Sequence, residues 1–438
     1  MSSSSFKKRK KRGPTWKVDN GIHQLANSIR KRFEELPPLS SKCCIYRVPR
    51  TLRSVNSCAY KPCIISIGPL HHGTTRLQGM QEHKLRYVQD FLRRNERRTL
   101  KDYLRAIKGW EKKAREYYIE SVSLSSDEFV EMVFVDGCFV IEFFVNWHWE
   151  VLDEQDRIFG KPSLEHVIRR DFLLIENQLP FFVLEGLYNL AFENEFTKGF
   201  LSFVDLSSEV LLGESELPKK FKKPDRILHF VDFMRTYFLP SNRRDLNYVP
   251  PRNVEWDFPQ GVGDLHDAGV QFATTTKHSS LLDIKFENGI LYIPKLDVED
   301  HTEALLLNLS AFEQCHYNYD SYIVDYILLM DVLITTLKDV DILISSGIVS
   351  NSLGNNDDVA RLFNTICRET SYEAHKFYYS DLCRQLVAHS KAPWNKWKAT
   401  LRHDYFNNPW TIISVFAAIV LLILTVVQTA CCIFSLKR

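Results

Sequence analysis

The sequence predicts a mainly α-helical protein: a compact helical body with a small β-hairpin and short extended segments, followed by one C-terminal transmembrane helix. Glycine and proline number only 17 each among 438 residues, too few for a loop-rich all-β protein. Most apolar runs have helical spacing, and one Asn-Gly pair lies between alternating runs. The stretch from Tyr405 to Leu436 contains no charged residue.

Composition and charge exclude several classes of protein. Apolar residues make up 45% and charged residues 25%, which suffices for a packed core and excludes wholesale disorder or a fibrous repeat. The basic run Lys7–Arg12 contributes six charges to the net +2, so the rest of the chain carries −4 and is not a basic nucleic-acid-binding surface. We therefore expect no nucleic-acid partner. The run itself is compatible with a solvated tail, which is favoured, a patch for acidic lipids or a nuclear signal.

The N-terminal third combines a short helix, an irregular stretch and a long helix. Apolar residues at helical spacing predict a helix over Ile22–Leu36, and no apolar segment of a secretory signal follows the basic run. Prolines and glycines interrupt Ile45–Gly73, so we expect extended segments and turns there, with Ile64–Ile67 a short buried strand or strand-like stretch. Gly79–Trp110 is predicted to be one long, charged helical region with an exposed basic face.

Two apolar segments are predicted to form the centre of the core. Ser125 and Glu128 make a capping box in front of Phe129–Trp147, a segment that is apolar nearly all round. A second helix is predicted over Asp171–Leu190, where Pro180 should kink or divide it.

The second half of the body is predicted to mix loops, a hairpin and helices. Thr197–Arg226 is a looser stretch, and Ser241–Gly263 is a long loop that suits a mobile insertion and divides the body. Asn288-Gly289 predicts a hairpin within Leu281–Leu296. Helices are predicted for four further segments: Ile227–Phe238, Glu303–Cys315, Tyr319–Leu343 and, as a helical pair, Val359–Ser390.

The C-terminal segment Trp410–Phe434 is predicted to span a membrane. Its length as a helix is about 37 Å, against a hydrocarbon core of about 30 Å. Four basic residues lie within the 20 residues before it and two after it, which favours a cytosolic body under the positive-inside rule. Plasma membrane and endomembrane both stay open. Cys431 and Cys432 are weak candidates for lipidation at the end of the span.

These features predict four parts along the chain. Residues 1–40 form a basic disordered tail and short helix, and residues 41–390 form the body, which has an internal division near 241–263. Residues 391–409 make a juxtamembrane linker, and residues 410–434 make the transmembrane helix.

No motif in the sequence predicts a catalytic, cofactor or metal site. The chain has no phosphate-binding loop of the Walker type, no HExxH, no GxSxG and no kinase loop, so we do not expect an enzyme. Ten cysteines without a CxxC spacing predict reduced, mostly buried thiols. Gly261-Val262-Gly263 is interpreted as a turn. For His71 and His72, hydrogen bonding to nearby backbone is favoured over a metal site.

Polar residues inside the two apolar segments are the remaining candidates for chemistry. They are Asp136, Glu142, Glu176, Asn177 and Glu185. A buried carboxylate is costly unless it is paired, so each is expected to bond an Arg, a Tyr or backbone and fix helix packing. The alternative is that facing acids with raised pKa values perform acid–base catalysis.

Six stretches together resemble a plant family named domain of unknown function 247. The stretches are IYRVPRTLRSVNSCAYKPCIISIGPLHHG, LQGMQEHKLRYVQDFL, MVFVDGCFVIEFF, DFLLIENQLPFFVLEGLY, DAGVQF and LLDIKFENGILYIPKLDVEDHTEALLLNLSAFEQC. The chain departs from the family pattern at Asp264-Leu265-His266, where a Glu-Leu pair is usual, and at Leu70, where an aromatic is common.

The resemblance implies a membrane-anchored plant protein without catalytic residues that could be transferred to this chain. Some grass members are associated with pollen-side self-incompatibility, which implies recognition or signalling. We therefore expect a recognition or signalling module with a protein partner of unknown identity. The alternative is an enzyme with an unrecognised site that uses the buried carboxylates. A deep polar pocket around Asp136, Glu142 and Glu176 would favour the enzyme.

Overall fold

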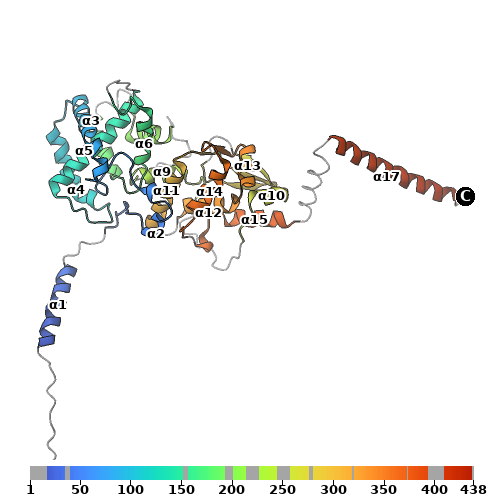
Figure 1. Ribbon diagram of the computed structural model, residues 1–438, viewed down its shortest axis with the longest axis horizontal. Coiled ribbons are helices and arrows are strands. Elements are labelled where there is room, and N and C mark those ends of the chain that lie inside the picture. The colour runs from blue at the N-terminus through green and yellow to red at the C-terminus, as the bar shows by residue number, and fades with distance from the viewer. Residues whose placement is uncertain are drawn as a thin grey trace, which may run out of the picture. The chain divides into compact units, whose positions relative to one another are not determined.

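The computed structural model describes ten stretches of the chain (Figure 1). They are residues 17–34, 40–150, 156–192, 201–213, 226–243, 257–275, 280–317, 320–371, 373–392 and 409–436. The chain divides into two units, Met1–Cys43 and Cys44–Arg438. The first unit contains helix α1 (Lys17–Glu34), which confirms the helix predicted from Ile22 onward.

Helix α5 (Ser126–His148) lies at the centre of the N-terminal half of the second unit. Its predicted capping box is present: the Glu128 amide donates to Ser125 Oγ at 3.3 Å, and the Ser125 amide donates to a Glu128 carboxylate oxygen at 2.8 Å. Helices α3 (Gln81–Arg94) and α4 (Leu100–Arg115) pack on α5 (Figure 1), and α7 (Phe181–Phe192) packs on it as well. The predicted central core helix is thereby confirmed.

Two of the predicted long helices are shorter than expected. The Gly79–Trp110 region is divided because a second capping box, formed by Thr99 and Asp102, starts α4 after a turn. Helix α6 (Pro162–Asp171) ends where the second core helix was predicted to begin, and residues 172–180 are irregular before α7. Pro180 does divide this segment, but the helix predicted N-terminal to it is wrong.

The helix α8 (Phe203–Leu212) lies within a stretch that the sequence predicted to be loose. The hydroxyl of Ser202 caps it by accepting from the Asp205 amide at 3.2 Å. Its apolar residues pack on α5 and α7, and this tertiary contact supports a helix that its local pattern did not predict.

The C-terminal half of the second unit is a further group of helices. Figure 1 shows five of them close together: α10 (Val262–Asp267), α12 (Tyr322–Leu333), α13 (Leu337–Ser345), α14 (Asn356–Ile366) and α15 (Ser380–Lys391). Of these, α13 packs on α10 and α14, and α14 also packs on α12. A capping box of Thr336 and Asp339 divides the predicted Tyr319–Leu343 helix into two. Residues 244–256 of the predicted long loop lie outside the described residues. Two further helices are α9 (Phe230–Phe238) and α11 (Thr302–His316).

The predicted hairpin is confirmed as part of a three-stranded sheet. Strands β2 (Lys285–Glu287) and β3 (Ile290–Ile293) are antiparallel, and Asn288 and Gly289 have φ values of 51° and 80°, as a two-residue hairpin turn requires. Strand β1 (Gln271–Thr274) pairs in parallel with the other edge of β3. A second, unpredicted sheet pairs β4 (Leu296–Val298) in parallel with β5 (Val349–Asn351).

A segment of largely irregular backbone, Cys44–Gly68, runs along the helices of the second unit, and we call it the strap. It contains helix α2 (Arg50–Arg53) and the 3-10 helix η1 (Ser57–Tyr60), and a second 3-10 helix, η2 (Thr75–Met80), follows it. The strand-like stretch predicted at Ile64–Ile67 is buried from Ile65 onward but joins neither of the two sheets.

The last described element is helix α17 (Pro409–Leu436). Its side chains are described at residues 413, 414 and 416–430, where all are exposed and nearly all are apolar. In the part of the chain that the structure describes, no helix meets the length and hydropathy of a membrane span, so the predicted anchor is not confirmed. The side chains of Trp410, Cys431, Cys432 and Phe434 lie outside the described ones.

Candidate functional site

Asp171 binds three consecutive amides of the strap. Its carboxylate accepts hydrogen bonds from the amides of Cys63, Ile64 and Ile65 at 2.7, 2.8 and 2.9 Å. The side chain is 1% exposed, and this burial raises its pKa against the opposing effect of the three amides. Asp171 therefore supplies the strap with the hydrogen-bond acceptors that a neighbouring strand supplies in a sheet.

Asn177 and Asp136 continue this pattern toward the end of the strap. The carbonyl oxygen of the Asn177 side chain accepts from the Ile67 amide at 2.7 Å, and its amide group donates to the Ile65 carbonyl at 3.1 Å. The Gly68 amide donates to Asp136 at 2.9 Å. Gly68 has a φ of +75°, and a Cβ there would lie 2.4 Å from the Gln178 carbonyl oxygen. Only glycine fits this close approach.

Asp136 also forms a buried ion pair with Lys84. The Lys84 ammonium lies 2.5 Å from Asp136 Oδ1 and donates to the Ser66 carbonyl at 2.5 Å. Lys84 is 0% exposed and Asp136 2% exposed. The predicted structural pairing of Asp136 is confirmed, but its cation was missed. Lys84 occurs four residues after Met80 and four before Val88, and this position on the apolar stripe of α3 was the available signal.

Glu142 follows Asp136 on α5, and in the part of the chain that is described only one of its two carboxylate oxygens has a hydrogen-bond partner. Arg94 donates to Glu142 Oε1 from Nε at 3.0 Å and from a terminal nitrogen at 2.6 Å. Glu142 Oε2 is buried without a hydrogen-bond partner in the described chain, and burial raises the pKa of this carboxyl. The predicted pairing is confirmed here too. Glu185, by contrast, is only half-buried on α7.

Glu176 is buried among positively charged residues of the strap. Glu176 Oε1 accepts from the Val48 amide at 2.6 Å and pairs with Arg53. Glu176 Oε2 lies 3.7 Å from Arg47 and 3.5 Å from His71 Nε2. Within the described residues neither Oε2 nor His71 Nε2 has a hydrogen-bond partner. His71 thus faces a carboxylate rather than the backbone groups that the sequence favoured.

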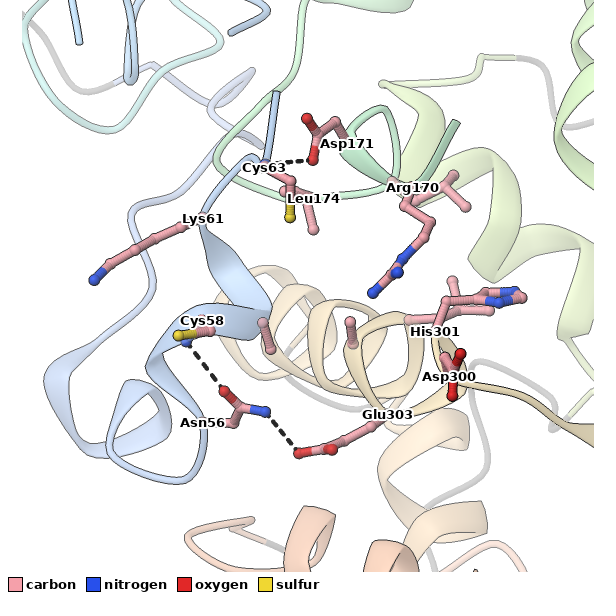
Figure 2. A pocket seen from close by; sticks show the side chains of 14 residues that line it. Asn56, Cys58, Lys61, Cys63, Arg170, Asp171, Leu174, Asp300, His301 and Glu303 are labelled. Atoms are coloured by element: carbon pink, nitrogen blue, oxygen red, sulfur yellow. Dashed lines mark hydrogen bonds between the residues drawn. The ribbon is translucent and has the colours of Figure 1, made fainter. Parts of the chain in front are cut away.

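A pocket of about 180 Å³ opens between the strap, the end of α6 and the start of α11 (Figure 2). Figure 2 shows the Arg170 side chain pointing into it, whereas Lys61 points away. Within the described residues the Arg170 side chain makes no hydrogen bond or ion pair. Glu303, which also lines the pocket, already accepts a hydrogen bond from the Asn56 side chain at 2.9 Å. Arg170 is therefore the cation in this pocket best placed to meet a ligand.

The pocket contains two of the free thiols, Cys58 and Cys63, and both residues are exposed. Burial of its thiol and the nearby Asp171 raise the pKa of Cys63, which disfavours the reactive thiolate. Of the eight cysteines whose surroundings are described, three are buried, three are half-buried and two are exposed. The prediction of mostly buried thiols is therefore wrong for this part of the chain.

The described residues contain no group of three or more His, Cys, Asp or Glu side chains that could hold a metal ion. Gly261 of the predicted turn serves as the N-cap of α10, and Gly263 lies inside that helix. The Gly263 amide donates to Asp339 at 2.6 Å. This is another case in which a carboxylate side chain binds a backbone amide.

Comparison with known proteins confirms the resemblance found in the sequence. The model of the family DUF247, described as plant protein of unknown function, matches residues 45–424. The Arabidopsis thaliana UPF0481 protein At3g47200 is 29% identical over 418 residues, covering 90% of this chain and 87% of the relative. A second Arabidopsis UPF0481 protein, At3g02645, is 23% identical over an alignment of 516 residues that covers 94% of both chains. No solved structure matches the chain.

Proposed function

Because the chain belongs to the plant family DUF247, whose description gives no activity, we propose from its own residues that it is a membrane-anchored recognition or signalling module. The helical body would present a binding surface to a protein partner, and residues 410–434 would hold it at a membrane. The observation that carries the proposal is that the buried carboxylates bind the protein's own backbone. Asp136, Asp171 and Glu176 bind the strap, as a rigid scaffold requires.

The anchor is supported by charge and exposure. No charged residue occurs from Tyr405 to Leu436, and the apolar side chains described in α17 are exposed, which water disfavours and lipid favours. Lys391, Lys396, Lys398 and Arg402 precede the segment, which favours a cytosolic body.

Removal of residues 405–438 tests the anchor. We expect full-length protein to float with phosphatidylcholine vesicles and the chain 1–404 to stay in the soluble fraction, with the helical circular dichroism of a folded body. Protease treatment of sealed microsomes tests the orientation, since a cytosolic body is digested while the vesicles remain intact. Flotation of the truncated chain with phosphatidylcholine vesicles, which carry no net charge, would contradict the proposed anchor, and a protected body would contradict the orientation.

The pocket beside the strap is the proposed point of recognition. At about 180 Å³ it is smaller than most metabolite sites, which measure roughly 300–1,000 Å³, and it suits one partner side chain. The unpaired guanidinium of Arg170 would bind a carboxylate or a carbonyl oxygen of the partner.

Proximity labelling in plant cells, with the label at the N-terminus, tests this point of recognition. We expect Arg170→Glu to remove a subset of labelled proteins that wild type labels. The matched control is Arg97→Glu, which makes the same charge change at an exposed position between α3 and α4. Equal labelling by wild type and Arg170→Glu would contradict a recognition role for the pocket.

An enzymatic role has one observation in its favour, the close approach of His71 Nε2 and Glu176 Oε2 at 3.5 Å. A histidine oriented by a carboxylate is a common arrangement for proton transfer. If this pair were catalytic, His71→Gln would abolish turnover and leave the folded body intact. A metabolite-depletion assay with wild-type and His71→Gln protein in plant extract separates this role from recognition.

A further inference from the structure

Helix α1 presents an apolar face that the described residues of its own unit leave uncovered. Ile22, Leu25 and Phe33 are 59%, 60% and 66% exposed, and Ile29 lies between them on the same side. At 3.6 residues per turn these four residues fall within an arc of about 80°. Helices with such an exposed arc are marginal in water and are stabilised when the apolar face is buried.

The charges of the N-terminal segment are distributed around this face. Arg30 and Arg32 lie on its two sides, about 100° and about 60° from its centre by helical geometry. Residues 1–34 contain ten basic and two acidic residues, a net charge of +8. Since the whole chain carries +2, the remaining residues carry −6. The positive charge is therefore concentrated where the apolar face is exposed.

We propose that α1 lies in the interface of an anionic membrane, with its apolar face in the lipid and its arginines at the headgroups. Long basic side chains at the border of an apolar arc can reach phosphate while their stems stay in the apolar layer. Neighbouring basic residues, here Lys7–Arg12, add attraction to an acidic leaflet. This contact is independent of the proposed anchor at residues 410–434 and lies outside the matched family region 45–424.

The combination of the two features selects a lipid surface over the other occupants. A nucleic acid would use the charge but leave the apolar face in water. A second copy of α1 would bury the apolar face but bring two segments of +8 together. An anionic bilayer satisfies both features at once.

The test is amide hydrogen exchange of α1 in the full-length protein reconstituted into two kinds of vesicle. One kind is phosphatidylcholine alone, and the other contains phosphatidylserine at about a third of the lipid. Both kinds of vesicle accommodate the C-terminal segment equally, so a difference in the exchange of α1 between them is due to the acidic lipid. We expect exchange over residues 21–34 to slow at least about tenfold on the acidic vesicles alone, and the effect to shrink in high salt. Peptides from α5 serve as the internal reference.

Two matched variants assign the protection to the apolar face. Leu25→Gln with Ile29→Gln should abolish it, whereas His23→Gln with Asn27→Gln, on the polar face, should retain it. Equal exchange on both vesicles would overturn the proposal. Protection of α1 without vesicles would also overturn it, because the occupant would then be the body or a second copy.

Discussion

The strap and the three-stranded sheet solve the same physical problem in two ways. Both contain extended, buried backbone whose amides need acceptors. In the sheet, β3 obtains them from the backbones of β1 and β2. In the strap, the amides of residues 63–65, 67 and 68 obtain them from the side chains of Asp171, Asn177 and Asp136.

The difference concentrates the stability of the strap in a few residues. A backbone ladder survives most side-chain substitutions because every residue supplies its own donor and acceptor. The strap depends on single carboxylates, each of which serves backbone 68 to 128 residues away in sequence. Substitutions in the two regions should therefore differ several-fold in cost, and four experiments measure that difference.

Replacing Asp171 should have the largest effect. Asp171→Ala leaves one buried and two partly buried amides without an acceptor, at about 1–3 kcal/mol each, so we expect the free energy of unfolding to fall by about 5 kcal/mol. Urea denaturation followed by circular dichroism measures it. Asp300→Ala, an exposed acid in the same pocket, should change stability little. Similar losses for both variants would remove the basis of the comparison.

Replacing Asp136 should cost nearly as much. Asp136→Asn leaves the Lys84 ammonium buried without its counter-charge, and we expect a loss of about 4 kcal/mol. Adding Lys84→Met removes the unpaired charge and should recover most of this loss, since exchanging both charged partners is often close to neutral. A double-mutant cycle in urea gives the coupling energy, and additive losses would contradict a direct pair.

The stability that His229 contributes through its contact with the start of the strap should depend on pH. Its Nε2 lies 3.1 Å from the Cys44 carbonyl, and burial lowers its pKa from 6.5 to about 3, so the folded protein holds it neutral. The unfolded chain takes up a proton as the pH falls below about 6.5. This contribution to stability is therefore complete above that pH and is lost toward pH 3, at about 1.4 kcal/mol per pH unit.

The variant His229→Asn isolates this contribution. Asparagine can still cap α9 but does not titrate, so the difference in unfolding free energy between wild type and variant should shrink as the pH falls from 7 toward 4. Buried acids with raised pKa values, such as Glu313, act in the opposite direction in both proteins and cancel in the difference. A difference that is constant with pH would contradict the lowered pKa, because His229 would then titrate alike in the folded and the unfolded protein.

The sheet should show the smallest effect. Asn288 has a φ of 51°, so Asn288→Ala puts a Cβ-bearing residue without a helpful side chain into the left-handed region, at about 1 kcal/mol. Glu287→Ala, an exposed residue on the edge strand β2, is the control and should be close to neutral. A loss as large as that of Asp171→Ala would mean that the hairpin, too, depends on one side chain.

Local signals account for the elements that the sequence predicted well. The capping box at Ser125, the all-apolar run behind it and the Asn288-Gly289 turn act over a few residues, and each is present in the structure. The breaks at Thr99 and Thr336 are equally local, since both are capping boxes, but they lie within long stretches, one charged and one apolar, that favoured a single helix each. Both boundaries are therefore encoded locally in the sequence.

The sequence by itself determined that the protein is mainly helical, where its central helix begins, where its hairpin turns, and that its buried acids need partners. Only the tertiary structure decided which partners those are. Lys84 for Asp136 and the amides of residues 63–65 for Asp171 come from segments about 50 to 110 residues away in sequence. The pocket around Arg170 likewise needs the strap, α6 and α11 to meet. The physical reason is that periodicity and capping record the surroundings of a residue along its own helix or strand, whereas the solvation of a buried charge depends on whatever backbone the fold brings to it.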